Sequence, residues 1–249
     1  MTKASSLKKE FAISSYELNQ RRQARLTTMA NFFQEIAYHH ANELGFGYEA
    51  MKQRQTMWLL SRMKIRMDEY PEWNDRIMIE TWPSGVDKLF FIRDFRVTGL
   101  SGKMLGAAST YWLIVSLETH RPLRPWEELE HYARITYGEP VFEKGLDKIA
   151  LPEHTEKIAC HLVGYSDLDI VGHVNNVKYM EWCIDAAMRG TGPDREIGEF
   201  EINYVHEAHF GEEVTITASG EGKMDSLHLF AATQDRDGSE VFRARLGWK

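Results

Sequence analysis

The strongest constraint in this sequence is a repeat, in which a helix followed by a run of four strands occurs twice. Apolar side chains recur at helical spacing over residues 27–45 and again over residues 172–189, which predicts the two helices. Alternating or β-branched runs between turn residues predict the strands. The strands after the first helix are Met57–Met67, Arg76–Trp82, Leu89–Thr98 and Ala107–Leu117, and those after the second are Phe200–Glu207, Glu213–Ser219, Leu227–Thr233 and Glu240–Trp248. This order predicts an α+β fold in two parts, residues 1–145 and 156–249, with a linker from about Gly145.

The two halves also share a local pattern. The stretch Ile65-x4-Tyr70-x2-Trp73-Asn74-Asp75-x-Ile77-x-Ile79 is matched by Ile202-x4-Glu207-x2-Phe210-Gly211-Glu212-x-Val214-x-Ile216. In both, a strand, a short turn and a second alternating strand follow the helix. Unrelated hairpins can look alike, so this match alone leaves open whether the halves are duplicates.

Composition narrows the class of protein. The chain is 43% hydrophobic and 27% charged, as in ordinary globular proteins, and no apolar run approaches the length of a membrane span. Its net charge of −7 argues against nucleic acid as a partner. The first residues are polar and predict no secretory signal. With only Cys160 and Cys183, and no CxxC pair, a reducing cytoplasm fits best.

The same search finds no cofactor signature. There is no glycine-rich phosphate loop, and the histidines are scattered without metal-ligand spacing. We therefore expect neither a cofactor nor a metal.

One segment carries a recognisable motif. The run Asp167-Leu-Asp-Ile-Val-Gly-His-Val-Asn-Asn-Val-Lys-Tyr179 resembles the Asp-x-Asn-x-His-Val-Asn-Asn signature of plant and bacterial acyl-acyl carrier protein thioesterases. The resemblance spans most of the chain from about Thr28 onward. Its other segments, in the family's order, are Trp58–Met63, Tyr70–Asp75, Ile77–Trp82 and Tyr204–Ala208.

The resemblance implies both a fold and a reaction. The fold is a tandem double hotdog, in which each half is a central helix wrapped by an antiparallel sheet. The reaction is hydrolysis of fatty acyl-acyl carrier protein, which releases free fatty acid without a cofactor. The implied partners are acyl carrier protein and its fatty acyl thioester. Acyl chain length and the choice between monomer and homodimer stay open.

The chemistry explains why such residues are needed. Water is a poor nucleophile near neutral pH, so a positioned base must take its proton. The resemblance implies Glu207 as that base, His173 as the group that assists proton transfer, and Asp169 as the residue that fixes the geometry. A glycine at a helix start allows close approach of a carbonyl to unpaired N–H groups. The substrate-binding candidates are therefore Gly172, Asn175 and Asn176.

Each candidate also has a structural explanation. Asp169 or Asp167 can cap the following helix or close a turn, which is common for aspartate before a helix. Glu207 can be a solvated charge at a strand end. The two asparagines can hold the loop at the helix start.

The sequence departs from the family at two positions. Val171 stands in place of the asparagine of the family's Asp-x-Asn-x-His motif, and Ala208 stands where plant members often have cysteine. Cys183 falls on the apolar side of its helix, which favours an inert thiol. Water activation is therefore favoured over a cysteine nucleophile. The first half has Tyr70 in place of Glu207 and no evident counterpart of Asp169-x3-His173, so we expect it to supply pocket wall.

Two other functions remain open. A hotdog hydrolase acting on acyl-CoA shares the motif's neighbourhood, and Val171 motivates a non-catalytic acyl-binding protein. A candidate docking surface for the acidic carrier protein is the alternation of Arg62, Lys64 and Arg66 with apolar residues, which places three cations on one face of a strand. A solvated strand face is the alternative.

Overall fold

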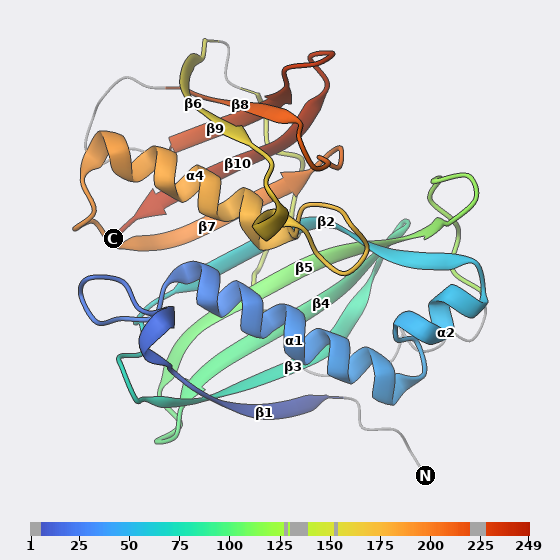
Figure 1. Cartoon of the computed structure of the whole chain (residues 1–249). Coiled ribbons are helices and arrows are strands. Elements are labelled where there is room, and N and C mark those ends of the chain that lie inside the picture. Colours follow the sequence, from blue (N-terminus) through green and yellow to red (C-terminus); the bar gives the residue numbers. More distant parts are fainter. Residues whose placement is uncertain (1–5, 127–128, 130–138, 152–153, 220–227) are drawn as a thin grey trace. The chain divides into compact units, whose positions relative to one another are not determined.

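The computed structural model describes residues 6–126, 129, 139–151, 154–219 and 228–249. The chain divides into two compact units, Met1–Leu146 (unit 1) and Asp147–Lys249 (unit 2). In each unit, one long helix lies across an antiparallel sheet (Figure 1), so the expected α+β architecture is confirmed. The first five residues and Leu227, which carry parts of the sequence predictions, lie outside the described residues.

Unit 1 orders its strands β1-β3-β4-β5-β2, each antiparallel to its neighbour. Its elements are β1 (Leu7–Ala12), the 3₁₀ helix η1 (Ser15–Glu17), α1 (Leu26–Leu44), α2 (Tyr48–Gln53), β2 (Thr56–Met67), β3 (Arg76–Asp87), β4 (Phe90–Gly99) and β5 (Met104–Ser116).

Unit 2 orders its strands β7-β10-β9-β8-β6, again antiparallel throughout. Its elements are β6 (Glu156–Leu162), the 3₁₀ helix η2 (Tyr165–Asp167), α4 (Asn176–Thr191), β7 (Ile197–Tyr204), β8 (Glu213–Ser219), β9 (His228–Gln234) and β10 (Glu240–Trp248).

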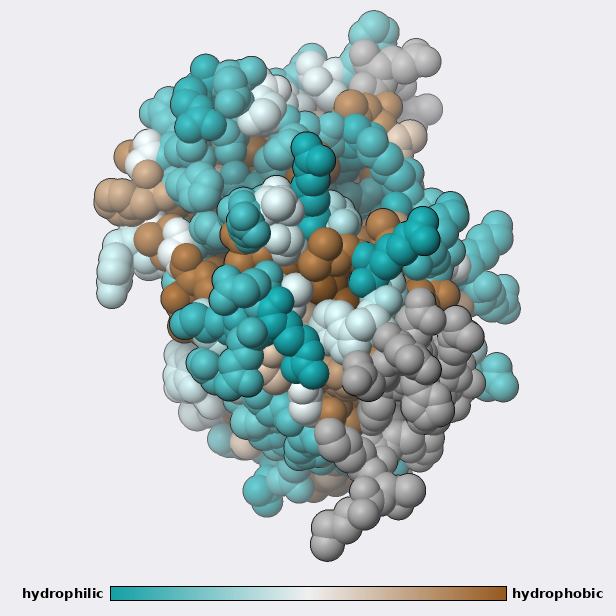
Figure 2. Space-filling view, turned by 90° about the vertical axis from the view of Figure 1, so that its right-hand side faces the viewer, coloured by the Kyte–Doolittle hydropathy of each residue, from teal (hydrophilic) through white to brown (hydrophobic). Residues whose placement is uncertain are grey.

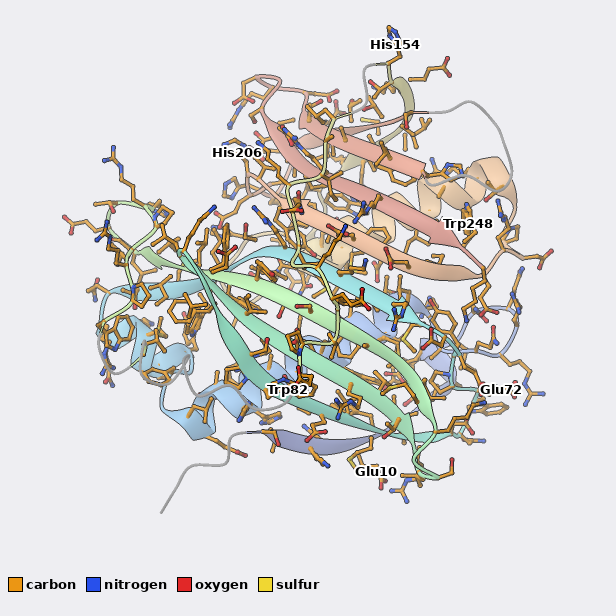
Figure 3. All side chains as sticks on the ribbon, turned by 180° about the vertical axis from the view of Figure 1, so that it is seen from behind. Glu10, Glu72, Trp82, His154, His206 and Trp248 are labelled. Atoms are coloured by element: carbon orange, nitrogen blue, oxygen red, sulfur yellow. The ribbon has the colours of Figure 1, made fainter. Side chains whose placement is uncertain are left out.

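The core of unit 1 forms where α1 meets its sheet. Met29, Phe33 and Ile36 are fully buried, and the Phe33 ring lies 4.9 Å from that of Phe95 on β4. Burial of such large apolar side chains stabilises the unit by about 1.5–3 kcal/mol each. The helix ends at Gly45, whose φ of 85° is left-handed, as predicted for this glycine. Figure 3, which views the units from behind, shows the strands of unit 1 in front of α1.

Unit 2 corrects two predicted boundaries. Its helix α4 begins at Asn176 rather than near residue 172, because Asn175 caps it and the residues before form a turn. The strand predicted to reach Glu207 ends at Tyr204, so Glu207 lies on the connection between β7 and β8. The predicted bounds of β8 and β10 agree with the structure, and those of β9 differ from it by one residue. The sequence predictions did not contain β1 or α2 of unit 1.

The segment predicted as a linker is held in place where it is described. In unit 1, the N–H of Leu146 donates to the Tyr111 hydroxyl at 3.2 Å, and its carbonyl accepts a hydrogen bond from Arg62. In unit 2, the N–H of Ile149 donates to Asn203 Oδ1 at 2.7 Å. Both Leu146 and Ile149 are buried. This part of the connector therefore packs as each unit's own structure.

Hydrophilic residues cover most of the face shown in Figure 2. Within the described residues, every helix is too short or too polar to cross a bilayer.

Gly106 on β5 provides a test of close packing. A Cβ built there would lie 2.6 Å from the carbonyl oxygen of Arg66, which belongs to the partner strand β2 and cannot rotate away. We expect Gly106→Ala to lower the free energy of unfolding by about 1–3 kcal/mol. Chemical denaturation measures this, with Gly190→Ala on α4 as the control, because a Cβ there meets nothing within 4 Å. Equal stability of the two variants would contradict the tight register of β2 and β5.

Candidate active site

A tight turn precedes α4, and the Asp169 side chain shapes it. Its Oδ1 accepts hydrogen bonds from the N–H groups of Val171 at 2.9 Å and His173 at 3.2 Å. The N–H of Asp169 donates in turn to the His173 carbonyl at 2.8 Å. Aspartate closes turns in this way because its short side chain reaches N–H groups a few residues ahead. The turn therefore fixes the backbone from which His173 projects.

Gly172 serves the conformation of this turn. Its φ of 84° is left-handed, where a side chain would be strained, and its N–H donates to the Asp169 carbonyl at 3.1 Å. The expectation that Gly172 lies at the helix start is wrong, because the helix starts four residues later. Its prediction as a substrate-binding residue stays untested.

The two asparagines hold the start of α4. The Oδ1 of Asn175 accepts the N–H of Val177 at 2.9 Å, which is a helix cap. The carbonyl of Asn176 accepts the hydroxyl of Tyr204 at 3.1 Å. The cap matches the structural alternative for Asn175, whereas the bond at Asn176 involves only its backbone, and the prediction of both as substrate-binding groups stays untested.

His173 and Glu207 form a pair. His173 Nδ1 lies 3.2 Å from Glu207 Oε2, and the two side chains are 27% and 35% exposed. An imidazole this close to a carboxylate can exchange a proton with it, and partial exposure leaves both groups within reach of water. Two of the three predicted catalytic residues thus touch, and the turn of the third, Asp169, carries His173.

Three hydrogen bonds hold the segment that carries Glu207. Gln234 Nε2 on β9 donates to the Glu207 carbonyl at 2.8 Å. The N–H of Ala208 donates to the Tyr179 hydroxyl at 2.9 Å, and the N–H of Val174 donates to the Ala208 carbonyl at 3.2 Å. Glu207 is thereby held against the turn of His173 although it lies beyond its strand.

Tyr179 is a site residue that the sequence predictions missed. Burial raises the pKa of its hydroxyl well above the usual value, and the carboxylates of Glu207 and Asp169 raise it further. The hydroxyl therefore keeps its proton while it accepts the Ala208 N–H. Tyr179 could have been found from the sequence, because it is the last residue of the motif. No sequence pattern indicated Gln234.

Asp167 has a structural place. Its carboxylate, 6% exposed, accepts from the Gly164 N–H at 2.8 Å and lies 3.0 Å from His161 Nε2. Burial alone would raise the pKa of Asp167, but the hydrogen bonds from His161 and Gly164 outweigh it and lower that pKa below its usual value. The residue ties β6 to η2, in line with the turn-closing alternative.

Comparison with known proteins adds to this geometry. A family model described as the acyl-ACP thioesterase N-terminal domain matches residues 4–132, and one described as the C-terminal domain matches residues 152–249. The chain belongs to the acyl-ACP thioesterase family. Its resemblance to that family and its double hotdog architecture, inferred from the sequence, are thereby confirmed.

Individual relatives agree with this membership. The chain is 28% identical over 261 residues to a chloroplastic palmitoyl-acyl carrier protein thioesterase of Gossypium hirsutum, covering 96% of this chain and 62% of the relative. It is 30% identical over 268 residues to the corresponding thioesterase of Arabidopsis thaliana, covering 97% of this chain and 63% of the relative. The chain thus spans slightly less than two thirds of the length of these plant relatives.

Solved structures share the fold over nearly the whole chain. An acyl-ACP thioesterase from Bacteroides thetaiotaomicron matches with a TM-score of 0.87 and 25% identity, over 98% of each chain. A 12:0-ACP thioesterase from Umbellularia californica matches with a TM-score of 0.82 and 24% identity, over 99% of this chain and 98% of that one.

The departures from the family motif have clear positions. The Val171 side chain is 41% exposed on the turn. Cys183 is fully buried in α4, and burial raises the pKa of its thiol well above the usual value, which disfavours the thiolate. Cys160 is exposed on β6. It lies near Glu213 and Asp235, and these three exposed side chains could together hold a metal ion. The sequence predictions named neither Glu213 nor Asp235 as a metal ligand.

Unit 1 contains the same turn with different side chains. The Oδ1 of Asn19 accepts the N–H groups of Arg21 at 2.9 Å and Gln23 at 3.1 Å, and the N–H of Asn19 donates to the Gln23 carbonyl at 2.8 Å. Asn19 thus takes the place of Asp169, and Gln23 that of His173. The first half, in which the sequence shows no evident counterpart of Asp169-x3-His173, thus repeats the hydrogen-bond pattern of the turn with other residue types.

The three predicted docking cations occupy one face of β2, as the alternation required. Met63, Ile65 and Met67 are buried on the other face. The cations have neighbours within unit 1, since Arg62 lies 4.7 Å from the Phe90 ring centre, and Lys64 and Arg66 lie 4.9 and 5.6 Å from that of Phe142. Arg66 is also paired with Asp68 at 3.6 Å.

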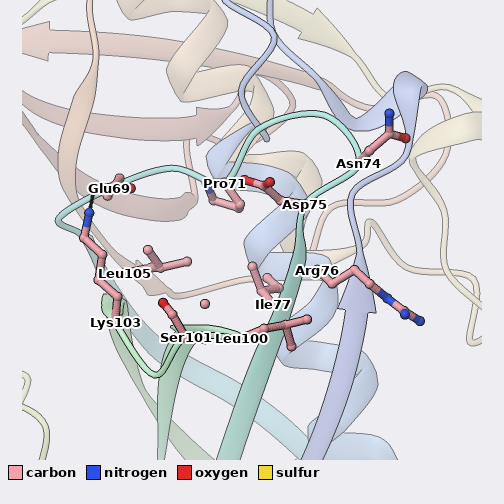
Figure 4. Close-up of a pocket in the computed structure, with 11 residues that line it drawn as sticks. Glu69, Pro71, Asn74, Asp75, Arg76, Ile77, Leu100, Ser101, Lys103 and Leu105 are labelled. Atoms are coloured by element: carbon pink, nitrogen blue, oxygen red, sulfur yellow. Dashed lines mark hydrogen bonds and ion pairs between the residues drawn. The ribbon is translucent and has the colours of Figure 1, made fainter.

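A pocket in unit 1 is separate from these residues. It lies between the turn at Pro71–Arg76 and the hairpin at Gly99–Leu105, and an ion pair of Lys103 with Glu69 borders it (Figure 4). None of the predicted catalytic, substrate-binding or docking residues lines it.

The native asparagine of unit 1 suggests a test of the turn in unit 2. We expect the free energy of unfolding of Asp169→Asn to lie within about 1 kcal/mol of the wild-type value, because the amide oxygen can accept the same two N–H groups. Asp169→Ala leaves both without that acceptor and should lose about 1–3 kcal/mol. Chemical denaturation and amide exchange at Val171 and His173 measure both. Equal losses would show that the charge, not the acceptor, holds the turn.

Proposed function

We propose that this protein hydrolyses the thioester of fatty acyl-acyl carrier protein and releases the free fatty acid. Family membership and the names of its relatives, which are thioesterases of palmitoyl- and oleoyl-acyl carrier protein, support the substrate class. The observation that carries the proposal is the contact of His173 Nδ1 with Glu207 Oε2 beside the Asp169 turn. A half-exposed imidazole–carboxylate pair is suited to activating water.

In this proposal the pair moves one proton. Glu207 takes it from a water whose oxygen attacks the carbonyl carbon of the thioester. The carbon–sulfur bond then breaks, and the proton returns through His173 to the departing sulfur, which leaves as a thiol. Asp169 holds the backbone of His173, and Tyr179 and Gln234 hold that of Glu207. Catalysis by such a positioned base is typically worth about 10²–10⁴-fold.

The proposal divides the work between the two halves. Residues 156–249 form the catalytic half, since all three proposed catalytic residues lie there. Residues 1–145 form the half that walls the substrate pocket. This is consistent with Asn19, Gln23 and Tyr70, none of which is a carboxylate or an imidazole, at the places of Asp169, His173 and Glu207.

The catalytic prediction uses non-additivity. We expect His173→Ala, Glu207→Ala and Asp169→Ala each to lower kcat/KM by about 10²-fold or more while the proteins stay folded. His173→Ala combined with Glu207→Ala should lose no more than the worse single variant, because the pair acts as a unit. Release of free fatty acid from acyl-acyl carrier protein measures this, and folding is checked by thermal unfolding.

Controls separate the competing functions. Cys183→Ala and Cys160→Ala should keep near wild-type turnover per folded molecule, and loss of activity in either would overturn water activation. Faster hydrolysis of acyl-CoA than of the carrier-bound acyl chain would instead assign a CoA thioesterase. Product from neither substrate would indicate an acyl-binding protein.

Carrier docking on β2 is a second part of the proposal. Acyl carrier proteins are acidic, and a protein of net charge −7 needs a local cationic surface to attract one. Arg62 hydrogen bonds to the connector, so its replacement would also disturb packing. Lys64 and Arg66 are therefore the better residues to change, with Arg62 as a contributor to the same face.

We expect Lys64→Glu with Arg66→Glu to raise KM several-fold for carrier-bound substrate and to spare a small acyl-pantetheine. Added salt should weaken the effect, because exposed charges are screened beyond about 10 Å at 0.1 M ionic strength. The matched control is Lys8→Glu with Lys9→Glu on β1, which lies at the other end of the strand order of unit 1 and undergoes the same change in charge. Equal effects of the two pairs, or on both substrates, would exclude docking at β2.

A further inference from the structure

The two copies of the turn separate structural positions from chemical ones. Structural positions keep the same hydrogen bonds in both units. Asn19 and Asp169 close the turn, and Glu17 and Asp167 each accept an N–H three residues earlier, at 2.6 and 2.8 Å. The carbonyls of Pro71 and Ala208 each accept the N–H that follows the turn, from Ala24 and Val174 respectively. The same pattern of backbone hydrogen bonds therefore surrounds the turn in both units.

Among the positions that differ between the copies, three carry an imidazole or a carboxylate near the His173–Glu207 contact in unit 2. Gln23 is the counterpart of His173, because the N–H of each donates to the residue that closes its turn. Tyr70 is the counterpart of Glu207, because each precedes the residue whose carbonyl accepts the N–H that follows the turn. The third pair is Glu72 and His209. The N–H of Glu72 donates to Asp75 Oδ2 at 2.8 Å, and that of His209 donates to Glu212 Oε2 at 2.9 Å. Because the turn closes in both copies, it does not need the imidazole of His209.

The His209 side chain has a different contact. Its ring centre lies 5.1 Å from that of His173, and the two planes meet at 80°, which is an edge-to-face arrangement. Glu207 contacts the Nδ1 atom of the same His173 ring. The His173 ring therefore has a carboxylate beside one of its nitrogens and a second imidazole packed against it.

We propose that His209 is a positioning residue, whose ring fixes the rotation of the His173 imidazole so that Nδ1 stays directed at Glu207. This role rests on the proposed hydrolytic function. It requires an aromatic ring at position 209 but no ring nitrogen, which distinguishes it from a role in proton transfer. His209 is exposed, so its replacement should leave the fold intact.

The test compares His209→Ala with His209→Phe. An edge-to-face pair is worth about 0.5–1.5 kcal/mol, so removing the ring should lower kcat by about two- to tenfold with little change in KM. Phenylalanine keeps the packing and should restore most of the loss. The control is His206→Ala, since this exposed histidine of the same segment (Figure 3) bonds the Glu240 carbonyl instead. It should match the wild type.

A spectroscopic measurement makes the test independent of activity. Nitrogen-15 shifts of His173 report which ring nitrogen carries the hydrogen. We expect one dominant tautomer in wild type and His209→Phe, and averaged shifts in His209→Ala. An inactive wild-type protein with this pattern would refute the hydrolytic function but not the positioning. Unchanged kcat and shifts in His209→Ala, or equal loss in His209→Phe and His209→Ala, would overturn the positioning role.

Discussion

The acceptance of two N–H groups by one oxygen of Asp169 is the interaction on which the candidate site depends. It converts residues 169–173 into a closed turn and determines the direction in which His173 leaves the backbone. The left-handed glycine lies inside the closed turn, the Asn175 cap of α4 follows it, and Glu207 contacts the histidine that the turn carries. Such a bond is worth only about 1 kcal/mol to stability, yet its geometric effect reaches every residue of the site.

The recurrence of the turn in unit 1 shows what closure requires. Asn19 closes the first copy and Asp169 the second, so an acceptor oxygen suffices and a charge is not needed for the fold. A left-handed residue also recurs, as Arg22 with φ 63° in unit 1 and Gly172 with φ 84° in unit 2. The backbone thus accepts different side chains, which explains how one copy can carry an imidazole–carboxylate pair while the other lacks it.

Much of the fold could be predicted from the sequence, because the spacing of apolar residues indicates which side chains are buried. The stripe of Met29, Phe33 and Ile36 predicted α1, and the alternation of Met63, Ile65 and Met67 predicted the buried face of β2. The motif similarly brought Asp169, His173 and Glu207 together. Contacts made by backbone groups were not accessible, since no side-chain pattern records them. The start of α4 at Asn176, the bond from Gln234 to the Glu207 carbonyl and the duplicated turn all belong to this class.

The placement of Glu207 beyond the end of β7 has a consequence for motion. Its segment is held by Tyr179 from α4, by Gln234 from β9 and by Val174 from the turn, each through one hydrogen bond to the backbone at 207–208. All three bonds act on the backbone of two adjacent residues, so they restrain one short stretch of chain, and none of them belongs to the ladder of a sheet. Segments held by few bonds open at a lower cost in free energy than core strands do. Opening of this short stretch would therefore separate the Glu207 carboxylate from His173 without breaking a strand pairing.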